Sequence, residues 1–350
     1  MSDERVFGLC PSPVGRYDRI VLGHGSGGRL TQDLVNRVFL PAFDNPVLAA
    51  LEDQATVAVD GARVALTTDS FVVRPLFFPG GDIGSLAVHG TVNDLAVGGA
   101  TPLFLAAAFI LEEGLPVADL ERIAASMRRA CDEAGVALVT GDTKVVDKGK
   151  GDKVFITTTG IGRVPPGLAL SVANARPGDA VLVSGTLGDH GIAIMSVREG
   201  LAFETVLESD SASLASLTRA LLEASPRIRC MRDPTRGGLA SATNEIAAAS
   251  RVGIELDETA IPVRPEVRGA CEILGLDPLY VANEGKLVAV VPREDEERVL
   301  AALRAHPLGA EGALVGRIVE AHPGVVTVRS ILAGERVLGL LSGEQLPRIC

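Results

Sequence analysis

Short apolar stretches of strand length alternate with longer amphipathic stretches of helix length along most of this chain. Such alternation favours an α/β fold, because each strand-length stretch can pack against the helix beside it. The alternation is interrupted once, in the segment 163–177, where Pro165, Pro166 and Gly167 disfavour regular structure. With 350 residues the chain is also too long for one ordinary core. We therefore expect two α/β domains that meet at this segment.

The two domains are expected over residues 18–163 and 175–330, and a tail over 341–350 follows them. The tail includes Pro347 and has no partner strand in sequence, so it is predicted to be mobile. The predicted strands cover 20–23 (as a strand or a turn), 56–59, 63–68, 103–111, 136–140, 154–162, 180–184, 253–256, 286–291, 314–318 and 325–328. The predicted helices cover 26–39, 83–97, 117–134, 213–224, 238–250, 266–274 and 294–305, and one more begins at Gly188.

Charge and cysteine usage restrict the partners and the compartment. A net charge of -11 repels phosphate backbones, so no nucleic-acid partner is expected. The first residues lack the basic-then-apolar order of a signal peptide, and no uncharged apolar stretch reaches about 18 residues, so no membrane association is expected. The cysteines are odd in number, widely spaced and without a CxxC pair, which indicates a reducing, cytoplasmic location. They are Cys10, Cys131, Cys230, Cys271 and Cys350.

A glycine-rich segment, GHGSGG, precedes the first predicted helix. Backbone amides at such a turn can approach anionic oxygens closely, and the N-terminus of a helix favours negative charge. A tight turn without a ligand explains the segment equally well. As a phosphate site, its candidate residues are Gly25, Ser26, Gly27 and Gly28.

Four aspartates form a second candidate site, because each lies next to an apolar strand or at the start of a helix. Asp69 is expected to end a strand, and Asp142 to follow the strand 136–140. Carboxylates that converge at one edge of a sheet can hold Mg²⁺, which prefers oxygen ligands and usually shares them with substrate phosphates. Taken singly, each is equally a turn or helix-capping aspartate. The candidate metal ligands are Asp53, Asp69, Asp94 and Asp142.

The chain has only five lysines among its 33 basic residues, and four of them fall between Lys144 and Lys153. A lysine can lose its proton when its surroundings lower its pKa, which an arginine does not do. Lys144 differs from its neighbours because it lies in the motif GDTK, next to Asp142.

These motifs occur in a fixed order that includes DPTRGG at 233–238, NEGK at 283–286 and the terminal PRIC at 347–350. Together they resemble the HypE family of carbamoyl dehydratases, which act in hydrogenase maturation. That family belongs to the PurM-like superfamily of aminoimidazole ribonucleotide synthetase and selenophosphate synthetase. The resemblance covers residues 18–350, and DPTRGG and PRIC are its most specific motifs.

The resemblance implies a two-domain PurM-like architecture. Its N-terminal domain would hold a mixed sheet, bind ATP with Mg²⁺ and pair in a homodimer. Family members use ATP to dehydrate an S-carboxamide on the C-terminal cysteine, here Cys350, to a thiocyanate. The carbamoyl group comes from a HypF-type carbamoyltransferase, and the cyano group passes to iron held by a HypC–HypD complex, for nickel–iron hydrogenase. The nucleotide-binding residues it implies, beyond the glycine-rich segment, are Asp69, Asn93, Asp94, Asp142 and Thr143.

Three residues are the candidates for catalysis. Cys350 would carry the reacting group, and only its thiolate attacks. Arg348 favours the thiolate, whereas the terminal carboxylate disfavours it. The nitrogen of the carboxamide must lose two protons, and either Glu284 or Lys144 can serve as the base. In DPTRGG, Arg236 offers a planar fork for phosphate or carboxylate, or simply stabilises a loop between domains.

Two other functions are compatible with parts of the sequence. The chain can be a different PurM-like synthetase of the selenophosphate or purine-pathway type, which would place its nucleophile elsewhere. It can also be a non-catalytic scaffold that delivers iron ligands between partners. ATP turnover that depends on a carbamoyl group on Cys350 would distinguish a carbamoyl dehydratase from both of these alternatives.

Overall fold

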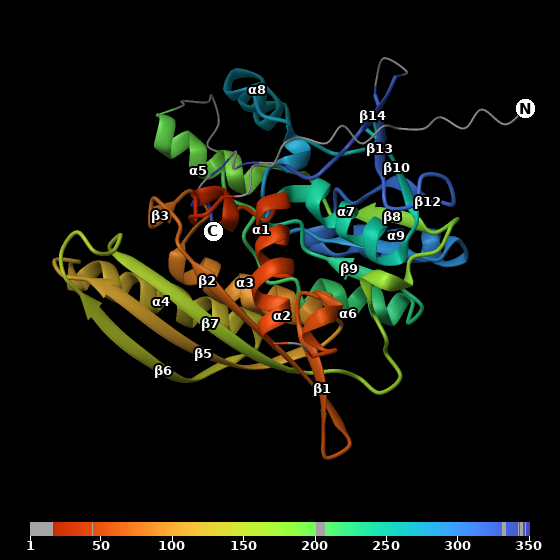
Figure 1. The fold of residues 1–350 in the computed structure, drawn as a ribbon. Helices are drawn as coiled ribbons and strands as arrows, with labels where there is room; N and C mark the ends of the chain where they lie inside the picture. The colour runs from red at the N-terminus through yellow and green to blue at the C-terminus, as the bar shows by residue number, and fades with distance from the viewer. Residues whose placement is uncertain are drawn as a thin grey trace, which may run out of the picture.

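Each half of the chain builds one large β-sheet, and helices pack on both sheets (Figure 1). The computed structural model describes residues 17–43, 45–200, 207–330, 334–341, 343, 346 and 348–350. The expected two-domain α/β architecture is confirmed, because the first sheet uses strands between residues 55 and 163 and the second uses strands between 180 and 337.

The N-terminal sheet has five strands in the order β1-β2-β7-β5-β6. These strands are β1 (Ala55–Val59), β2 (Ala62–Phe71), β5 (Thr101–Glu112), β6 (Ala137–Val146) and β7 (Val154–Arg163). The sheet is mixed, since β5 and β6 are parallel and the other neighbouring pairs are antiparallel. A small hairpin of β3 (Phe77–Phe78) and β4 (Gly81–Asp82) leads into the helices that cover one face, α3 (Ile83–Val97) and α4 (Val117–Ala134).

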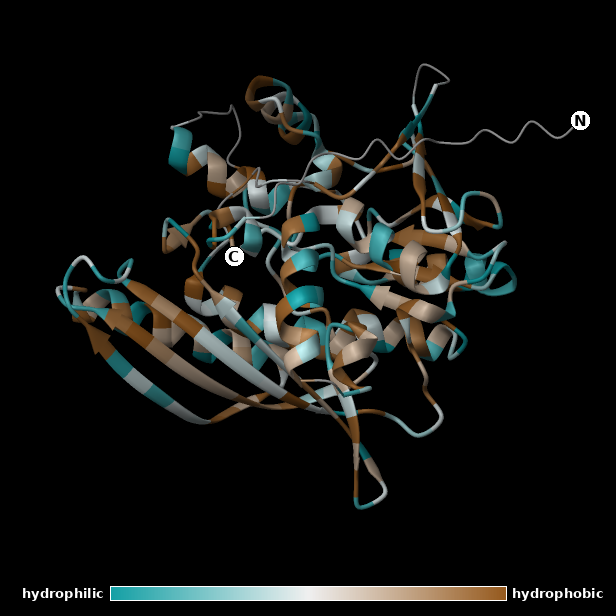
Figure 2. Ribbon diagram, viewed as in Figure 1, coloured by the Kyte–Doolittle hydropathy of each residue, from teal (hydrophilic) through white to brown (hydrophobic). Residues whose placement is uncertain are grey.

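The two faces of this sheet differ in burial. Toward α3 and α4, side chains such as Leu105 and Ile156 are fully buried. On the other face Phe104 is 47 % exposed, and Val139 on the edge strand β6 is 60 % exposed. Figure 2 shows hydrophobic stretches along the outer strands of this sheet. The N-terminal domain therefore presents an uncovered, partly apolar sheet face and a free sheet edge.

Helix α3 is buried on all sides because both domains pack against it. The Asp82 side chain caps its start by accepting hydrogen bonds from the amides of Gly84 (2.7 Å) and Ser85 (3.1 Å). One side packs on β2 and β7, and the other packs on α6 and β9 of the second domain. Its side chains are apolar on nearly every face, as expected for a central helix.

The C-terminal sheet has seven strands in the order β14-β13-β10-β12-β8-β11-β9. The strands are β8 (Ala180–Val183), β9 (Cys230–Arg232), β10 (Gly253–Asp257), β11 (Val288–Val291), β12 (Ala313–Val319), β13 (Val326–Arg329) and β14 (Glu335–Val337). The helices are α5 (Asp189–Glu199), α6 (Ala215–Ala224), α7 (Gly238–Ser250), α8 (Pro265–Leu274) and α9 (Glu296–Ala305). Short 3-10 helices occupy Leu48–Ala50, Val172–Asn174, Pro278–Tyr280, Arg293–Asp295 and Pro307–Gly309.

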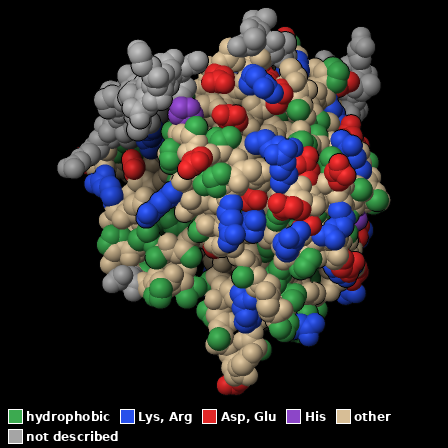
Figure 3. Space-filling view, turned by 90° about the vertical axis from the view of Figure 1, so that its right-hand side faces the viewer, with side chains coloured by type: hydrophobic (Ala, Val, Ile, Leu, Met, Phe, Trp, Pro, Cys, Tyr) green, Lys and Arg blue, Asp and Glu red, His purple; other side chains and the backbone are tan. Residues whose placement is uncertain are grey.

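Alternating residues of β8 divide this domain into two apolar layers. Val181 and Val183 pack in one core with α7, whereas Ala180 and Leu182 pack in another with α6 and α9. The sheet is thus covered on both faces, as the strong burial of its central strands requires. Figure 3 shows the outer side of this half of the molecule, where basic and acidic side chains are interspersed. In the described part of the chain, no helix has the length and apolarity needed to cross a membrane.

The chain departs from the predicted elements at several positions. Residues 20–23, predicted as a strand or a turn, lead into a 3-10 helix, Leu22–Gly25. The predicted helix 26–39 begins later, as α1 (Arg29–Leu34), and continues through the π-helical turn Val35–Phe39 into α2 (Leu40–Phe43).

Two strands are longer than predicted, so Asp69 and Asp142 lie inside β2 and β6 and do not follow their ends. Asp142 is tolerated within β6 because β6 is an exposed edge strand, and Asp69 is tolerated within β2 because it faces a cavity. Gly141 also suits the strand, since a Cβ at this position would lie 2.3 Å from the carbonyl oxygen of Ala107 on β5.

Candidate active site

A cavity of about 400 Å³ lies where the two domains meet. Its wall combines the glycine-rich segment, the strand β2, helix α3, the loop before α7 and the end of the chain. The residues that line it include Gly25, Ser26, Asp53, Asp69, Asp94, Asp233, Arg236, Glu284 and Cys350. Residues from across the whole sequence therefore share one cavity.

Three carboxylates in this cavity form a compact oxygen cluster. One oxygen each of Asp53, Asp94 and Asp233 lies within 4.8 Å of the others. Asp53 precedes β1, Asp94 projects from α3 and Asp233 follows β9 directly. The Thr67 hydroxyl donates to Asp94 Oδ2 (2.7 Å), and Arg232 pairs with Asp53. The cluster thus joins the N-terminal segment, the central helix and the second domain.

The cluster holds more negative charge than its protein surroundings neutralise. Burial raises the pKa of Asp233 to about 7, and the nearby charge of Asp69 adds to the rise. Burial also raises the pKa of Asp94 well above its ordinary value, with further contributions from Asp69, Asp233 and Asp53. A divalent cation with oxygen ligands relieves this repulsion, and three carboxylate oxygens at this spacing suit Mg²⁺. The residues therefore fit a magnesium site.

The predicted metal ligands are distributed differently from the sequence expectation. Asp53 and Asp94 belong to the cluster, and Asp69 lines the same cavity beside it. Asp142 is not brought to the cavity of its own chain. It lies exposed on β6, where its carboxylate pairs with Lys144 at 2.8 Å.

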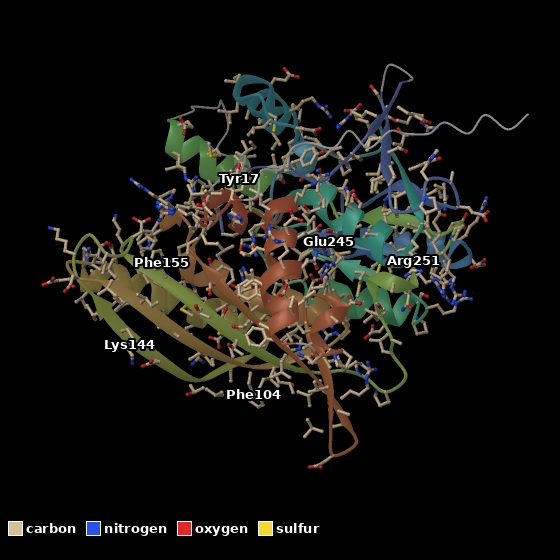
Figure 4. The ribbon with its side chains drawn as sticks, viewed as in Figure 1. Tyr17, Phe104, Lys144, Phe155, Glu245 and Arg251 are labelled. Carbon is tan, nitrogen blue, oxygen red and sulfur yellow. The ribbon has the colours of Figure 1, made fainter. Side chains whose placement is uncertain are left out.

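Lys144 and Thr143 share this outer position. Lys144 projects from the outermost strand of the N-terminal sheet, away from the labelled Glu245 near the carboxylate cluster (Figure 4). Within one copy of the chain, the GDTK residues and the cavity are separate.

Cys350 is half-buried and lines the cavity. Burial raises the pKa of its thiol to about 12, and the negative charge of Glu284 adds to the rise, whereas Arg236 opposes it. The thiol is therefore protonated near neutral pH. Arg236 also donates from Nη1 to the carbonyl oxygen of Gly25 (2.7 Å), so its guanidinium links the glycine-rich segment to the cysteine.

Glu284 combines a fixed backbone with an unpaired carboxyl oxygen. Its amide donates to Asp210 Oδ1 (3.0 Å), and its carbonyl oxygen accepts from Asn93 Nδ2 (3.1 Å). Its side chain is buried, and Oε1 has no hydrogen-bond partner among the described residues. Burial raises its pKa well above the ordinary value, with Asp233 and Asp210 adding to the rise. A buried carboxyl without a partner in a cavity is a good candidate for proton transfer.

The candidate nucleotide residues divide into lining and packing positions. Gly25 and Ser26 line the cavity. Gly27 has φ +77°, and a Cβ there would press on the backbone of Arg236. The glycine at 28 allows the carbonyl oxygen of Leu341 to approach and accept from the amide of Arg29 (2.9 Å). Two of the four candidate residues in the glycine-rich segment therefore serve close packing.

Asn93 also has a packing role, because its side chain is saturated with protein partners. Its Nδ2 donates to the carbonyl oxygens of Ala212 and Glu284, and its Oδ1 accepts from the amide of Leu214 (2.8 Å). Since it lies on α3, it ties the first domain to the second beside Glu284.

A second groove, about 710 Å³ in volume, adjoins the carboxylate cluster. It runs between the N-terminal helices and α7, and small residues such as Ala242 and Ala249 line it. It shares Asp53, Asp233 and Arg236 with the first cavity. The two spaces therefore lie on either side of the same residues of the cluster.

Sequence reasoning did not assign Asp233 or Arg232 to the site. Asp233 stands in the motif DPTRGG, shortly before a glycine pair and the predicted helix 238–250, which is a usable signal. Arg232 is buried, and it binds both Asp53 and Glu245. One of these partners, Asp53, lies far away in sequence, so no local sequence pattern predicts the role of Arg232 in the site.

This fold and site define a two-domain protein of the class of AIR synthase related proteins. Residues 51–164 match the family model of the N-terminal domain of AIR synthase related proteins, and residues 176–329 match the C-terminal one. The carbamoyl dehydratase HypE of Cupriavidus necator is 59 % identical over 333 residues, which are 95 % of each chain. The chain belongs to the HypE family of carbamoyl dehydratases, as its motifs predict.

Solved structures agree with this assignment. A structure described as HypE in complex with ATP has 51 % identity and a TM-score of 0.80, covering 95 % of this chain and 100 % of the other. A structure described as a HypE–HypF complex has 49 % identity and a TM-score of 0.84, covering 88 % and 99 %.

Proposed function

We propose that this chain dehydrates an S-carboxamide on Cys350 to a thiocyanate at the expense of ATP, in the maturation of nickel–iron hydrogenase. The observation that carries the proposal is the position of Cys350. Its thiol lines the same cavity as Arg236, Glu284 and the carboxylate cluster. Membership of the HypE family supports the reaction class.

The reaction needs the carboxamide oxygen to become a leaving group. In the proposed sequence this oxygen attacks the γ-phosphorus of ATP, so an O–P bond forms and ADP departs. The C–O bond then breaks as phosphate leaves, and the nitrogen gives up two protons as the C≡N bond forms. Positioning and charge neutralisation supply most of the catalysis in phosphoryl transfer. Arg236 lies where it can neutralise charge near the sulfur.

Glu284 is the proposed proton acceptor. Its unpaired, buried oxygen lies in the cavity with Cys350, and its fixed backbone keeps that oxygen in place. The raised pKa makes it a stronger base than an ordinary carboxylate once it is ionised, and Arg236 favours the ionised form. Lys144 remains the second candidate, and it requires a neighbouring copy of the chain.

ATP is proposed to occupy the cavity and the adjoining groove. Phosphates would lie at the cluster of Asp53, Asp94 and Asp233, which would hold Mg²⁺ and so neutralise phosphate charge. Gly25 and Ser26 line this region, and the apolar groove wall of α7 offers space for the nucleoside. The ATP complex of a similar HypE supports ATP as the substrate.

A homodimer is proposed through the uncovered face and edge of the N-terminal sheet. Phe104, Ile110 and Leu138 are each more than 40 % exposed there, and such apolar surface is typical of an interface. The GDTK residues lie on β6 at this edge. In a dimer they would lie at the contact between copies, from which Lys144 of the partner subunit can approach a neighbouring cavity.

The partners are proposed from the family. A HypF-type carbamoyltransferase would load Cys350, as the HypE–HypF complex of a similar chain suggests. A HypC–HypD complex would receive the cyano group on its iron. The described cysteines Cys131, Cys230, Cys271 and Cys350 are free thiols, which supports the proposed cytoplasmic location.

Mass spectrometry of the C-terminal peptide tests the proposal. After carbamoylation by a HypF-type enzyme, the peptide should carry one carbamoyl group on Cys350, and on addition of ATP it should lose one water. Cys271→Ser serves as the control, because Cys271 is buried in the second domain away from the cavity. ATP turnover that continues unchanged in Cys350→Ala would refute the proposal and favour another synthetase chemistry.

A further inference from the structure

The last residues of the chain lie along the segment that follows β2. The amide of Val72 donates to a main-chain carboxylate oxygen of Cys350, and the amide of Arg74 donates to the carbonyl oxygen of Arg348, each at 3.1 Å. This alternation of pairs is the pattern of one side of an antiparallel ladder. The end of the chain is therefore aligned in register with residues 72–74.

Helix α5 supplies the remaining polar contacts to this end. His190 Nε2 lies 2.6 Å from the carbonyl oxygen of Ile349, and Nδ1 lies 2.8 Å from the Ser209 hydroxyl. A carbonyl oxygen only accepts, so Nε2 carries the proton and Ser209 donates to Nδ1. The ring is fully buried and packs edge-on against Phe78.

Arg198 lies about two turns after His190 on α5 and donates hydrogen bonds to two carbonyl oxygens. Its Nε donates to that of Arg74 (2.5 Å), and its Nη2 donates to that of Arg348. It thus clamps the end of the chain to the segment with which it pairs. The Ile349 side chain is 5 % exposed and packs in the core of the first domain.

The hydrogen bonds that reach residues 348–350 all end on main-chain oxygens, and none of these bonds is made to the sulfur. We infer that His190, Arg198 and the backbone of residues 72–74 form a tail seat, which fixes the Cys350 sulfur in the cavity whatever group it carries. His190 and Arg198 are thus positioning residues for the reaction. The part about substituted forms rests on the proposed function, in which the sulfur is free, carbamoylated and cyanated in turn.

The seat explains how one site can serve successive forms of the cysteine. A contact to the sulfur would be lost or would clash each time the substituent changed. Contacts to the carbonyl oxygens persist, so the same residues can present the thiol, the carboxamide and the thiocyanate to Arg236 and Glu284. Release of the tail then depends on competition for the seat and not on the chemistry at sulfur.

Digestion of the intact protein by carboxypeptidase measures how firmly the end is seated, without any need for turnover. The rate at which Cys350 is released is followed by mass spectrometry. His190→Asn keeps a polar group near Ser209 but cannot reach Ile349, whereas His190→Gln places an amide nitrogen near the position of Nε2. We expect about tenfold faster release in His190→Asn and wild-type protection in His190→Gln, since a tenfold change corresponds to about 1.4 kcal/mol.

Arg198→Gln is the second variant, and it carries little risk to folding because Arg198 is partly exposed. It should also release Cys350 about tenfold faster. His306→Gln is the matched control, because His306 bonds Ser216 near the surface and takes no part in the seat. Cys350→Ala, which removes the sulfur, should keep wild-type protection of the end.

Two outcomes would overturn the inference. The first is equal release from wild type, His190→Asn and Arg198→Gln. The second is loss of protection in Cys350→Ala as large as that in His190→Asn, which would show that sulfur contacts hold the end. If the wild type is protected as expected but never dehydrates a carbamoyl group, the seat stands and the proposed function fails. In an active enzyme, Arg198→Gln should lower kcat and leave KM for ATP unchanged.

Discussion

Glu284 and Arg236 act on Cys350 in opposite directions. The negative charge of Glu284 raises the pKa of the thiol, and the positive charge of Arg236 lowers it. Both side chains line the cavity that contains the sulfur. Burial raises the thiol pKa most, and the balance between these two charges adjusts how much thiolate is available to receive a group, because only the thiolate is nucleophilic.

Alkylation of Cys350 by iodoacetamide should follow this balance. Because burial raises the thiol pKa to about 12, the rate should still be rising with pH above pH 10, where an ordinary cysteine of pKa 9.0 approaches its plateau. Glu284→Gln should shift the profile to lower pH, and Arg236→Gln should shift it to higher pH. Shifts in the same direction in both variants would contradict the assignment.

Loss of the proposed base should separate binding from chemistry. Glu284→Gln keeps the backbone contacts of Glu284 to Asp210 and Asn93. Dehydration should fall by about a hundredfold or more, the usual effect of removing a general base, while ATP affinity stays near wild type. Single-turnover mass spectrometry of the C-terminal peptide measures the rate of dehydration, and calorimetry measures the affinity for ATP. Glu255→Gln, at an exposed position of a strand, is the control. Rapid dehydration by Glu284→Gln would instead assign the role of general base to Lys144.

Strand β6 extends beyond the end that the sequence predicts for it. Local polarity at Gly141 and Asp142 suggested a strand end at Thr140, yet β6 continues to Val146 in parallel with β5. The continuation is determined by pairing with a strand about 35 residues away, which no local pattern encodes. By contrast, α3, α4 and α7 were predicted at their observed bounds, because glycines follow or precede each of them in sequence.

A charge on the uncovered sheet should separate the proposed dimer. Val139→Glu places a carboxylate at a position that is 60 % exposed in one chain and would be buried between copies. We expect monomers at micromolar concentration, measured by analytical ultracentrifugation. Val337→Glu, on the exposed strand β14 of the second domain, should leave the association state unchanged. A Val139→Glu protein that associates like wild type would place the interface elsewhere.

The arrangement of the whole site could be foreseen only in part. Asp53, Asp69, Asp94, Glu284 and Cys350 were all named from motifs, and the structure places them around one cavity. The replacement of Asp142 by Asp233 in the carboxylate cluster arises from the packing of the second domain on α3. Likewise, the tail was expected to be mobile, and that stays a prediction, although residues 348–350 lie in a defined seat.

Because the carboxylate cluster joins both domains, a bound cation should stabilise the molecule as a whole. Millimolar Mg²⁺ should raise the midpoint of thermal unfolding at pH 8, which is above the pKa of about 7 to which burial raises Asp233. Asp233→Asn should show a much smaller rise, and it should be the more stable protein without Mg²⁺ because one buried charge is gone. Asp257→Asn, at a partly exposed position that does not line the cavity, is the control. An equal rise in Asp233→Asn would place the cation elsewhere.

Helix α3 has a consequence for how this protein is made. Its Val97 side chain is fully buried in a core that includes Leu214 and Leu217 of the second domain. During synthesis α3 emerges more than a hundred residues before these partners, with that side of the helix uncovered. The newly made half therefore presents an apolar helix face and a free sheet edge together. We expect this half to need chaperone protection most while the second half is still being synthesised on the ribosome.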